Sequence, residues 1–329
     1  MRGTQVMKVL MVGAGTMGRV HAQAWAEIDE GELVGVVDPD PACGASLARS
    51  ASVPAFASLE EALGVMAVDV VDVCVPTYLH RATVEQALTA GCHVICEKPM
   101  ALNLDEAQSM IDAATRARRQ LLIAHVVRFF PQYALARQRV KNGAIGEVGT
   151  ARTFRGGAYP VGWQDWYGDP NKSGTLATDL LIHDIDFLRW TFGEVQRVYA
   201  KSLNVKGDHV LVSLRFANGL IAQCEGSWAY PAGFSYAFEL AGREGLIAFD
   251  SRQSRAIEVW ESTAPLAPRV AIPESPLVQS PYVAELEHFL AVIRDGVEPR
   301  VTAEDAFRAL ELSMMVRRSW ETGQPVEVE

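Results

Sequence analysis

The strongest constraint on the fold is the alternation of short apolar runs with helical patterns over the first 125 residues. The runs are continuously apolar, which is typical of strands buried on both faces of a parallel sheet, and the helices between them would cover those faces. The alternation therefore predicts an α/β fold with a doubly wound parallel sheet and right-handed connections. The apolar runs lie at 8–13, 33–38, 68–76, 93–97 and 121–125, and the helical patterns near 17–29, 41–50, 58–64, 80–90 and 104–118.

The glycine motif GAGTMG follows the first apolar run and opens the first helical pattern. In this context Gly13 permits a tight turn, Gly15 lets the backbone approach a pyrophosphate, and Gly18 allows close packing of helix and strand. The second run ends at Asp38, where a carboxylate would accept hydrogen bonds from ribose hydroxyls. The motif predicts dinucleotide binding, with NAD favoured over NADP because a carboxylate repels a 2′-phosphate. The alternative is that Asp38-Pro39-Asp40 is only a turn and a helix cap.

After residue 125 the pattern changes to strand-like segments joined by turns, and Asn218-Gly219 is a strong hairpin signal. We expect a dinucleotide-binding domain over 1–125 and a substrate-binding and oligomerisation domain over 126–329, built on a large open, mostly antiparallel sheet. Two helical patterns, at 282–296 and 302–323, end the chain. The segments LVSLRF and LIAQCEGSW are too apolar for a face in water, which predicts an interface and a homodimer or homotetramer.

The segment 173–190 reads as a helix with an unusual second stripe. At about 100° per residue, Asp179, His183 and Asp186 share one side of a helix whose remaining circumference is apolar. Ionisable groups in such surroundings lose hydration and shift each other's pKa. They are usually paired, bound to metal, or catalytic, and the stripe alone leaves these three alternatives open.

The tetrapeptide EKPM follows the apolar run that ends at Glu97. The carboxyl ends of strands border the ligand crevice of an open α/β sheet, so Lys98 would lie at that crevice. Pro99 restricts the backbone of Lys98 to extended geometry and would make it a stiff support for an ammonium group. The alternative is a loop lysine paired with Glu97.

Together these features resemble the glucose-fructose oxidoreductase, inositol dehydrogenase and MocA family of oxidoreductases. The resemblance spans the chain and is carried by GAGTMG, VPTYLH (75–80), EKPM (97–100) and TDLLIHDIDFLRW (178–190). It implies a Rossmann domain, a second α/β domain, a site in the cleft between them, and oxidation of a sugar or polyol hydroxyl. The Asp-xxx-His pattern is particularly similar to inositol dehydrogenases, whereas the loop 163–174 departs from that subgroup.

The resemblance implies that Lys98, Asp179 and His183 are catalytic. His183 is the best general base, because imidazole titrates near neutral pH, and Asp179 can orient it or the substrate hydroxyl. Lys98 can stabilise developing alkoxide charge. A buried structural pair is the alternative for Asp179 and His183. The other expected cofactor-binding residues are Gly13, Gly15, Thr16, Met17, Gly18, Asp38, Val75, Pro76, Thr77, His80, Glu97, Lys98 and Arg128, and the expected substrate-binding residues are Lys98, Arg155, Trp166, Asp179 and His183.

His80 could equally be a helix-start residue and Arg128 a structural salt bridge, while aromatic residues such as Trp166 are more often plain packing. Asp186 is expected to serve structure.

Composition narrows the classes of partner. The formal charge of −10 and the absence of a basic run argue against nucleic acid, and no apolar stretch is long enough to span a membrane. The five cysteines form no CxxC pair, and HVIC (93–96) reads as a buried strand rather than a zinc site, so we expect a cytoplasmic protein without metal. Two rival functions share the predicted fold, namely a glycosidase that retains NAD and a non-catalytic sensor of dinucleotide or sugar; hydrolysis at a divalent metal on the Asp/His stripe is a third.

Overall fold

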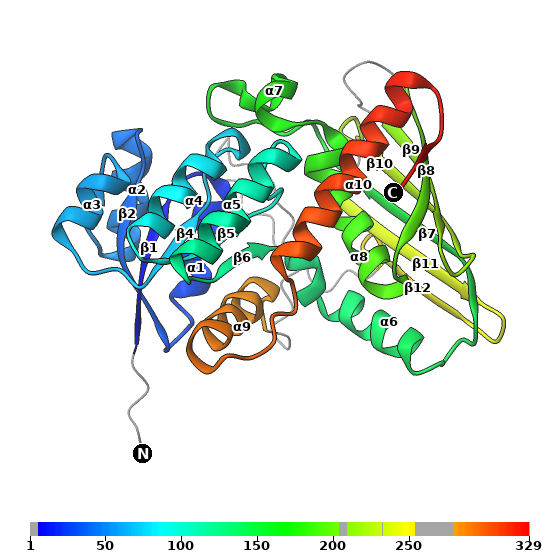
Figure 1. Cartoon of the computed structure of the whole chain (residues 1–329), viewed down its shortest axis with the longest axis horizontal. Helices are drawn as coiled ribbons and strands as arrows, with labels where there is room; N and C mark the ends of the chain where they lie inside the picture. Colours follow the sequence, from blue (N-terminus) through cyan, green and yellow to red (C-terminus); the bar gives the residue numbers. More distant parts are fainter. Residues whose placement is uncertain (1–5, 204–208, 232, 254–278, 329) are drawn as a thin grey trace. The chain divides into compact units, whose positions relative to one another are not determined.

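The protein is described by a computed structural model that covers residues 6–203, 209–231, 233–253 and 279–328. The chain forms two compact units (Figure 1). The first comprises Met1–Phe129 and Gln279–Phe307, and the second comprises Phe130–Val278 and Arg308–Glu329. The expected boundary after residue 125 lies four residues before this division. From the sequence we expected one domain boundary, whereas the segment from Gln279 to Phe307 also belongs to the first unit.

The first unit contains a parallel sheet with the strand order β3-β2-β1-β4-β5-β6, which confirms the predicted doubly wound fold class. The carboxyl ends of β1, β4 and β5 are neighbours in this order, so the loops that follow them meet at one edge. The short strand β3 was not expected. The strands are β1 Met7–Val12, β2 Gly31–Val37, β3 Ala55–Phe56, β4 Val70–Val73, β5 His93–Glu97 and β6 Leu121–Ala124.

The helices of the first unit begin at residues that suit helix starts. Asp40 and Asn103 accept hydrogen bonds from backbone N–H groups of the turns that they cap, as side-chain oxygens at this position commonly do. Gly296 ends α9 in the left-handed conformation, with a φ of 67°. The helices are α1 Thr16–Trp25, α2 Pro41–Ala51, α3 Leu59–Val65, α4 His80–Thr89, α5 Leu104–Ala117 and α9 Pro281–Asp295, with 3₁₀ turns η1 Thr77–Leu79 and η2 Val126–Phe129.

The second unit is built on a sheet with the order β12-β11-β7-β10-β9-β8-β13. Its strand pairs are antiparallel except for β7 and β10, which run parallel, so the prediction of a mostly antiparallel sheet is confirmed. The expected hairpin joins β9 to β10, where Gly219 has a φ of 89°. The strands are β7 Val148–Gly156, β8 Val195–Ser202, β9 His209–Phe216, β10 Ile221–Ser227, β11 Ser235–Gly242, β12 Leu246–Asp250 and β13 Val326–Glu327.

The segment expected to be one helix over 173–190 is divided. Gly174, with a φ of 79°, ends the first turn, and a π-helical turn then precedes a regular α-helix. Asp179 lies in the π turn and His183 in the helix that follows it. The helical elements of this unit are α6 Pro131–Lys141, η3 Trp163–Gly168, α7 Pro170–Ser173, the π turn η4 Ala177–Leu181, α8 Ile182–Phe192 and the greater part of α10 Ala303–Thr322.

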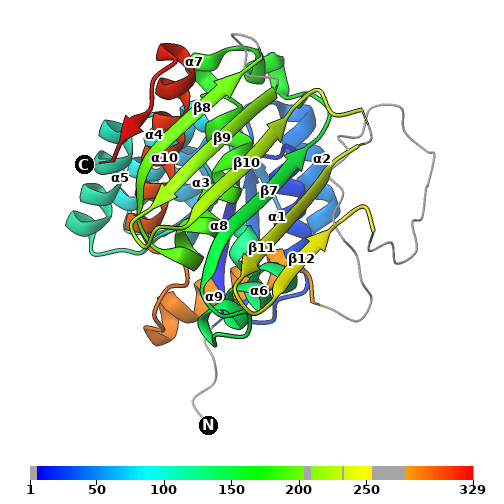
Figure 2. The same cartoon turned by 90° about the vertical axis from the view of Figure 1, so that its right-hand side faces the viewer.

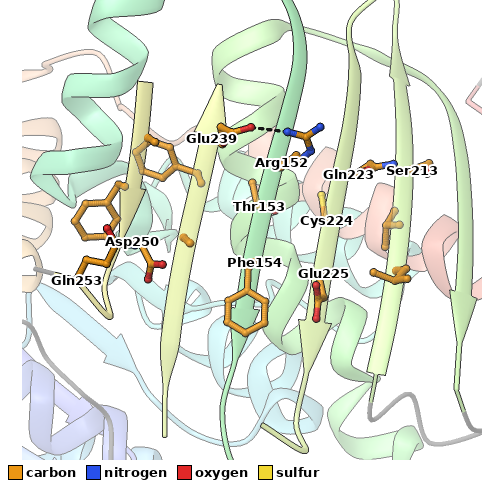
Figure 3. Close-up of a pocket in the computed structure, with 16 residues that line it drawn as sticks. Arg152, Thr153, Phe154, Ser213, Gln223, Cys224, Glu225, Glu239, Asp250 and Gln253 are labelled. Atoms are coloured by element: carbon orange, nitrogen blue, oxygen red, sulfur yellow. Dashed lines mark hydrogen bonds and ion pairs between the residues drawn. The ribbon is translucent and has the colours of Figure 1, made fainter. Parts of the chain in front are cut away.

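Among the described residues, helices cover one face of the second unit's sheet and leave the other face, here called the open face, uncovered. Figure 2 looks onto the open face, with α8 and α10 behind the strands. Side chains alternate between the faces, so Thr153 is buried, whereas Arg152 on the open face is exposed (Figure 3). Leu211 and Ile221 are 62% and 52% exposed on the open face. Polar residues separate them, so this face is less uniformly apolar than the sequence indicated. Among the described residues, no helix combines the length and apolarity needed to cross a membrane.

Candidate active site

The glycine turn between β1 and α1 is shaped by contacts that exclude larger side chains. A Cβ atom added to Gly13 would lie 2.5 Å from the Cys74 carbonyl oxygen, and one added to Gly18 would lie 1.9 Å from the Gly13 oxygen. Around Gly15, by contrast, the described residues leave 4 Å of open space. Gly15 is the N-cap of α1, and within the described part of the chain no side chain caps this helix. The first-turn N–H groups can therefore receive a pyrophosphate, which is the group the motif predicts.

Asp38 lies at the end of β2 and is held against the glycine turn. Its Oδ2 accepts a hydrogen bond from the backbone N of Ala14 at 2.7 Å, and its Oδ1 accepts one from Asp40 N at 2.8 Å. The helix cap of α2 is a different residue, Asp40, which accepts from Ala42 and Cys43. Asp38 is thus more than a turn residue, because its carboxylate is anchored beside the predicted phosphate cradle and remains partly exposed. The residues present fit a dinucleotide.

The loop after β4 carries Val75, Pro76 and Thr77 and lies next to the glycine turn through Cys74. His80, at the start of α4, is buried and joins this loop to the next one. Its Nδ1 is 2.9 Å from the carbonyl oxygen of Pro99, and its Nε2 is 2.9 Å from that of Val75. Burial lowers the pKa of His80. Both ring nitrogens face protein carbonyls, so this ring connects the loops after β4 and β5, and direct contact between the ring and a cofactor has no support in this geometry.

Glu97 and Lys98 form the corner at the end of β5. The Glu97 carboxylate is 5% exposed, and its Oε2 accepts from the backbone N of Lys98 at 2.9 Å. Its Oε1 lies 3.3 Å from Nε2 of His21, so both oxygens contact protein groups. Lys98 itself is half-buried. The Lys98–Pro99 peptide bond is cis.

Arg128 forms a structural salt bridge, which was the alternative to its expected role in cofactor binding. It is 1% exposed, and its Nη1 donates to the Arg300 carbonyl oxygen at 2.7 Å and to Asp305 Oδ2 at 3.0 Å. The guanidinium therefore ties η2 to the start of α10 inside the first unit. A direct role in binding a cofactor has no support in these contacts.

In the second unit, the predicted Asp/His stripe separates into residues of two kinds. Asp179 and His183 are half-buried, whereas Asp186, the third member of the stripe, is buried, as is the neighbouring Asp184. Asp179 lies in the π turn, an element that is rare and frequently found at functional sites. Most residues that flank them are buried and apolar, so Asp179 and His183 are the ionisable groups of η4 and the first turn of α8 that keep partial access to solvent.

Arg155, which was expected to contact substrate, is buried beneath the sheet. Its Nε donates to Asp184 Oδ2 at 2.6 Å, and its Nη2 donates to the Tyr133 hydroxyl at 3.1 Å. Burial alone would lower the pKa of Arg155, but the Asp184 carboxylate raises it, so the guanidinium stays charged. Arg155 therefore joins β7 to α8, and its charge is already matched inside the protein.

The loop before α7 is aromatic and has an unusual backbone. Trp166 and Tyr167 lie with their ring centroids 3.9 Å apart, and both are half-buried. Gln164 and Asp165 adopt positive φ values of 52° and 49°, which non-glycine residues rarely do and which cluster at ligand sites. An indole and a phenol here suit the apolar face of a sugar ring, so the expectation for Trp166 remains open.

One cluster of ionisable groups was missed from the sequence. His21, Asp72 and Cys74 are buried, with ligand-type atoms within 4.8 Å of one another. Hydrogen bonds hold these atoms together, since His21 Nδ1 lies 3.0 Å from Asp72 Oδ2. The available signal was Asp72, an aspartate in the middle of the valine-rich segment VDVVDVCVP, where a buried charged residue should find a partner.

Comparisons with known proteins agree with this architecture. Residues 7–125 match the model of an oxidoreductase family with an NAD-binding Rossmann fold, and residues 133–248 match the Gfo/Idh/MocA C-terminal domain. The chain therefore belongs to the Gfo/Idh/MocA family of oxidoreductases.

Named relatives cover almost the whole chain. The 1,5-anhydro-D-fructose reductase of Ensifer adhaerens is 29% identical over 97% of this chain and 98% of its own length. The inositol 2-dehydrogenase of Rhizobium meliloti is 27% identical over 94% of this chain and 95% of its own length. Among solved structures, GenD2 from gentamicin A biosynthesis in complex with NAD superposes with a TM-score of 0.88 at 27% identity, covering 99% of this chain and 97% of that one.

Proposed function

We propose that this member of the Gfo/Idh/MocA family oxidises a secondary hydroxyl of a sugar or polyol, with NAD as the hydride acceptor. The observation that carries the proposal is the pair Asp179 and His183, two partly exposed ionisable groups in a helical segment whose other acids are buried. The dehydrogenases and reductases of sugars and polyols among the relatives support this class of substrate.

Each residue has a defined role in the proposed reaction. His183 takes the proton of the substrate hydroxyl as the carbonyl forms, which suits the ordinary pKa range of imidazole. Asp179 orients that imidazole or the hydroxyl. Lys98 donates a hydrogen bond to the reacting oxygen and stabilises alkoxide charge. NAD, when bound, supplies the acceptor for the hydride of the carbinol carbon, so the products are a ketone, NADH and one proton.

The proposal is tested by following NADH formation with a panel of inositols, other polyols, aldoses and sugar phosphates. Lys98→Met should abolish turnover and leave NAD affinity within a few fold. His183→Ala should lose about two to four orders of magnitude in kcat, the usual range for a general base. His209→Ala removes an exposed histidine of β9 and serves as the matched control, with kcat unchanged. Turnover by His183→Ala near the wild-type rate, with a lower melting temperature, would make the pair structural.

The three residues are proposed to act as one unit. Removal of both His183 and Asp179 should then cost little more than removal of His183 alone, because groups that act together are non-additive. If the losses in kcat of the two single variants add up in the double variant, the two residues act independently.

We propose NAD rather than NADP as the cofactor because the Asp38 carboxylate is anchored beside the glycine turn, where it would repel a 2′-phosphate. Asp38→Ser combined with Pro39→Arg should shift the ratio of Michaelis constants towards NADP. A wild-type preference for NADP would reject this role of Asp38.

Two rival functions give different results in the same assays. A glycosidase that retains NAD would cleave glycosides without net NADH release. A sensor would bind dinucleotide or sugar and turn over none of the panel. The presence of Lys98 and His183 favours the dehydrogenase, since relatives that act as sensors would have no use for a general base.

We also propose that the chain forms a homodimer or homotetramer through the open face of the second unit's sheet. Leu211 and Ile221 are exposed there. The same strands also carry exposed polar side chains such as Gln223 and Glu225 (Figure 3), and interfaces share this mixture. Light scattering should give a mass above one chain, and Leu211→Lys with Ile221→Lys should lower it. A monomeric mass for the wild-type protein at micromolar concentration would refute the assembly.

A further inference from the structure

A cluster of buried ionisable side chains lies inside the first unit, beneath the corner that carries Lys98. It draws His21 from α1, Asp72 from β4, Glu97 from β5 and Glu285 from α9, and we call these four residues the His21 cluster. Three of them have no exposed surface, and Glu97 is 5% exposed. Charged groups at such depth are stable only when they are paired and hydrogen-bonded, so the arrangement of protons in the cluster is constrained by its geometry.

His21 lies between two carboxylates. Its Nδ1 is 3.1 and 3.0 Å from the two oxygens of Asp72, and its Nε2 is 3.3 Å from Oε1 of Glu97. A neutral imidazole carries one N–H and would turn a bare lone pair towards one of these carboxylates. An imidazolium keeps an N–H towards Asp72 and places its positive charge between both carboxylates. Nε2 lies at ion-pair distance from Glu97 and makes no hydrogen bond among the described residues, so it is the charge of the two flanking carboxylates that favours the doubly protonated ring.

The two carboxylates are held by further donors. Trp25 Nε1 donates to Asp72 Oδ2 at 2.8 Å. On the other side of the ring, Lys98 N donates to Glu97 Oε2 at 2.9 Å. The contacts thus form a chain from Asp72 through His21 and Glu97 to the backbone of Lys98, and this chain joins two neighbouring strands to α1.

The remaining groups that face the cluster are neutral. Burial, and then the charge of Glu97, raise the pKa of Glu285 well above its ordinary value, and neither of its oxygens has a hydrogen-bond partner among the described residues. Burial raises the pKa of the Cys74 thiol to about 12 and also raises that of Cys96. Burial opposes a charge on His21 as well, but Asp72 outweighs it and the pKa of His21 lies well above its ordinary value.

We propose that His21 is a positioning residue for Lys98, because as an imidazolium it ties Glu97 to Asp72 and so holds the backbone N–H of Lys98 in place. The inference rests on the proposed role of Lys98 in the reaction. The connection reaches the lysine through its main chain and does not involve its ammonium group. Loss of His21 therefore misplaces Lys98 without removing it, which lowers kcat more than it changes NAD affinity.

The first measurement is hydrogen exchange of the peptide that contains Lys98. In the wild-type protein the Lys98 N–H should be protected, and His21→Phe should remove that protection. Glu285→Gln is the matched control, because an amide has nearly the shape of the neutral acid, and it should keep protection at Lys98. Unchanged protection in His21→Phe would overturn the proposal. This measurement needs no substrate, so a failure of the proposed dehydrogenase activity would be seen separately in the turnover assay.

The second measurement separates positioning from simple stability. With a substrate found in the panel, His21→Phe should lower kcat by roughly 10–100-fold, the usual loss for a residue that orients an active group, with the NAD dissociation constant within a few fold. Glu97→Gln keeps an oxygen for the Lys98 N–H but loses its negative charge, so it should lose less activity. A His21→Phe protein that melts earlier but retains its kcat would make the cluster purely structural.

Nitrogen NMR of histidine provides the third measurement and does not depend on a variant that folds. Both ring nitrogens of His21 should report protons at a pH one unit above the ordinary histidine value of about 6.5. A single-proton tautomer at that pH would overturn the proposed charge state.

Discussion

Each unit contains a pair of opposite charges that is almost fully buried on both sides, and these two pairs differ in whether they can titrate. In the second unit, Arg155 meets Asp184, and an arginine keeps its charge at every pH at which proteins fold. In the first unit, His21 meets Asp72, and a histidine can lose its proton. The first pair therefore acts as a permanent connection, whereas the second depends on pH.

The surroundings of the two pairs differ in how fully their charges and polar groups are matched. The Arg155 guanidinium also donates to the Tyr133 hydroxyl and lies 5.4 Å from the centre of the Tyr236 ring, so its charge is met on several sides. The surroundings of His21 include a neutral acid, Glu285, which lacks a hydrogen-bond partner among the described residues. The difference indicates that Arg155 serves rigidity, while the His21 cluster keeps its geometry at some cost in stability.

The largest expected effect comes from breaking the permanent pair. Arg155→Met leaves the Asp184 carboxylate buried without its cation, which should lower the free energy of unfolding by about 3–5 kcal/mol. Urea denaturation measures it. Arg152→Met, three residues earlier on the opposite face of β7, is the control, because its ion pair with Glu239 is exposed and should contribute at most about 1 kcal/mol. Equal losses in the two variants would show that burial of the Arg155 pair adds nothing.

A smaller effect of opposite sign is expected at Glu285. Its raised pKa keeps the folded chain protonated where the unfolded chain has already ionised, so stability is lost as pH rises above the ordinary value of 4.5. Glu285→Gln removes that loss and should stabilise the protein by roughly 1–3 kcal/mol at pH 7.

The gain from Glu285→Gln should disappear below pH 4.5, where both forms of the wild-type chain are protonated. Glu287→Gln, on the same helix and partly exposed, is the control. A Glu285→Gln protein less stable than wild type at pH 7 would contradict a neutral Glu285.

The contrast between the pairs also shows what the sequence could predict. Apart from β3, the strands of the first unit, the helices near 41–50 and 104–118, and the glycine turn follow from local patterns, and the structure places them where those patterns predicted. The division of the segment 173–190 depends on a positive φ at Gly174 and a π turn, which α-helical periodicity does not encode. The sequence therefore placed Asp179 and His183 on one regular helix that the chain does not form.

Contacts between distant residues were beyond local patterns. His21 and Asp72 are 51 positions apart, and the pairing of Arg128 with Asp305 spans 177 positions. The return of α9 to the first unit likewise depends on packing, because its apolar face alone does not say which sheet it joins. Buried polar residues such as Arg155 were read as substrate contacts, since a sequence shows the charge but not the partner that neutralises it.

The smallest expected effect concerns pH and isolates His21. The pKa of His21 is raised in the folded protein, so the stability it contributes is complete below the ordinary value of 6.5 and is lost as pH rises through the folded value. Burial lowers the pKa of His80, His93 and His288, and groups shifted in that direction change stability only below 6.5. Arg155 keeps its charge and therefore adds nothing to the change of stability with pH. Above pH 6.5 and below the ordinary cysteine value of 9.0, a Glu285→Gln protein should therefore still lose about 1 kcal/mol of stability per pH unit, from His21.

Replacing His21 with a cation that does not titrate in this window should remove the slope. We expect denaturation curves of Glu285→Gln to shift to lower urea concentration between pH 7 and 8.5, and those of Glu285→Gln with His21→Lys to coincide. The ordinary pKa of lysine, about 10, lies above this window, and the carboxylates of Asp72 and Glu97 oppose the lowering of that pKa by burial. The two proteins differ only at residue 21. Any dependence of stability on pH that they share therefore comes from groups other than His21. A level curve in the Glu285→Gln protein would mean that His21 is already neutral, and the two buried pairs would then differ in composition but not in their response to pH.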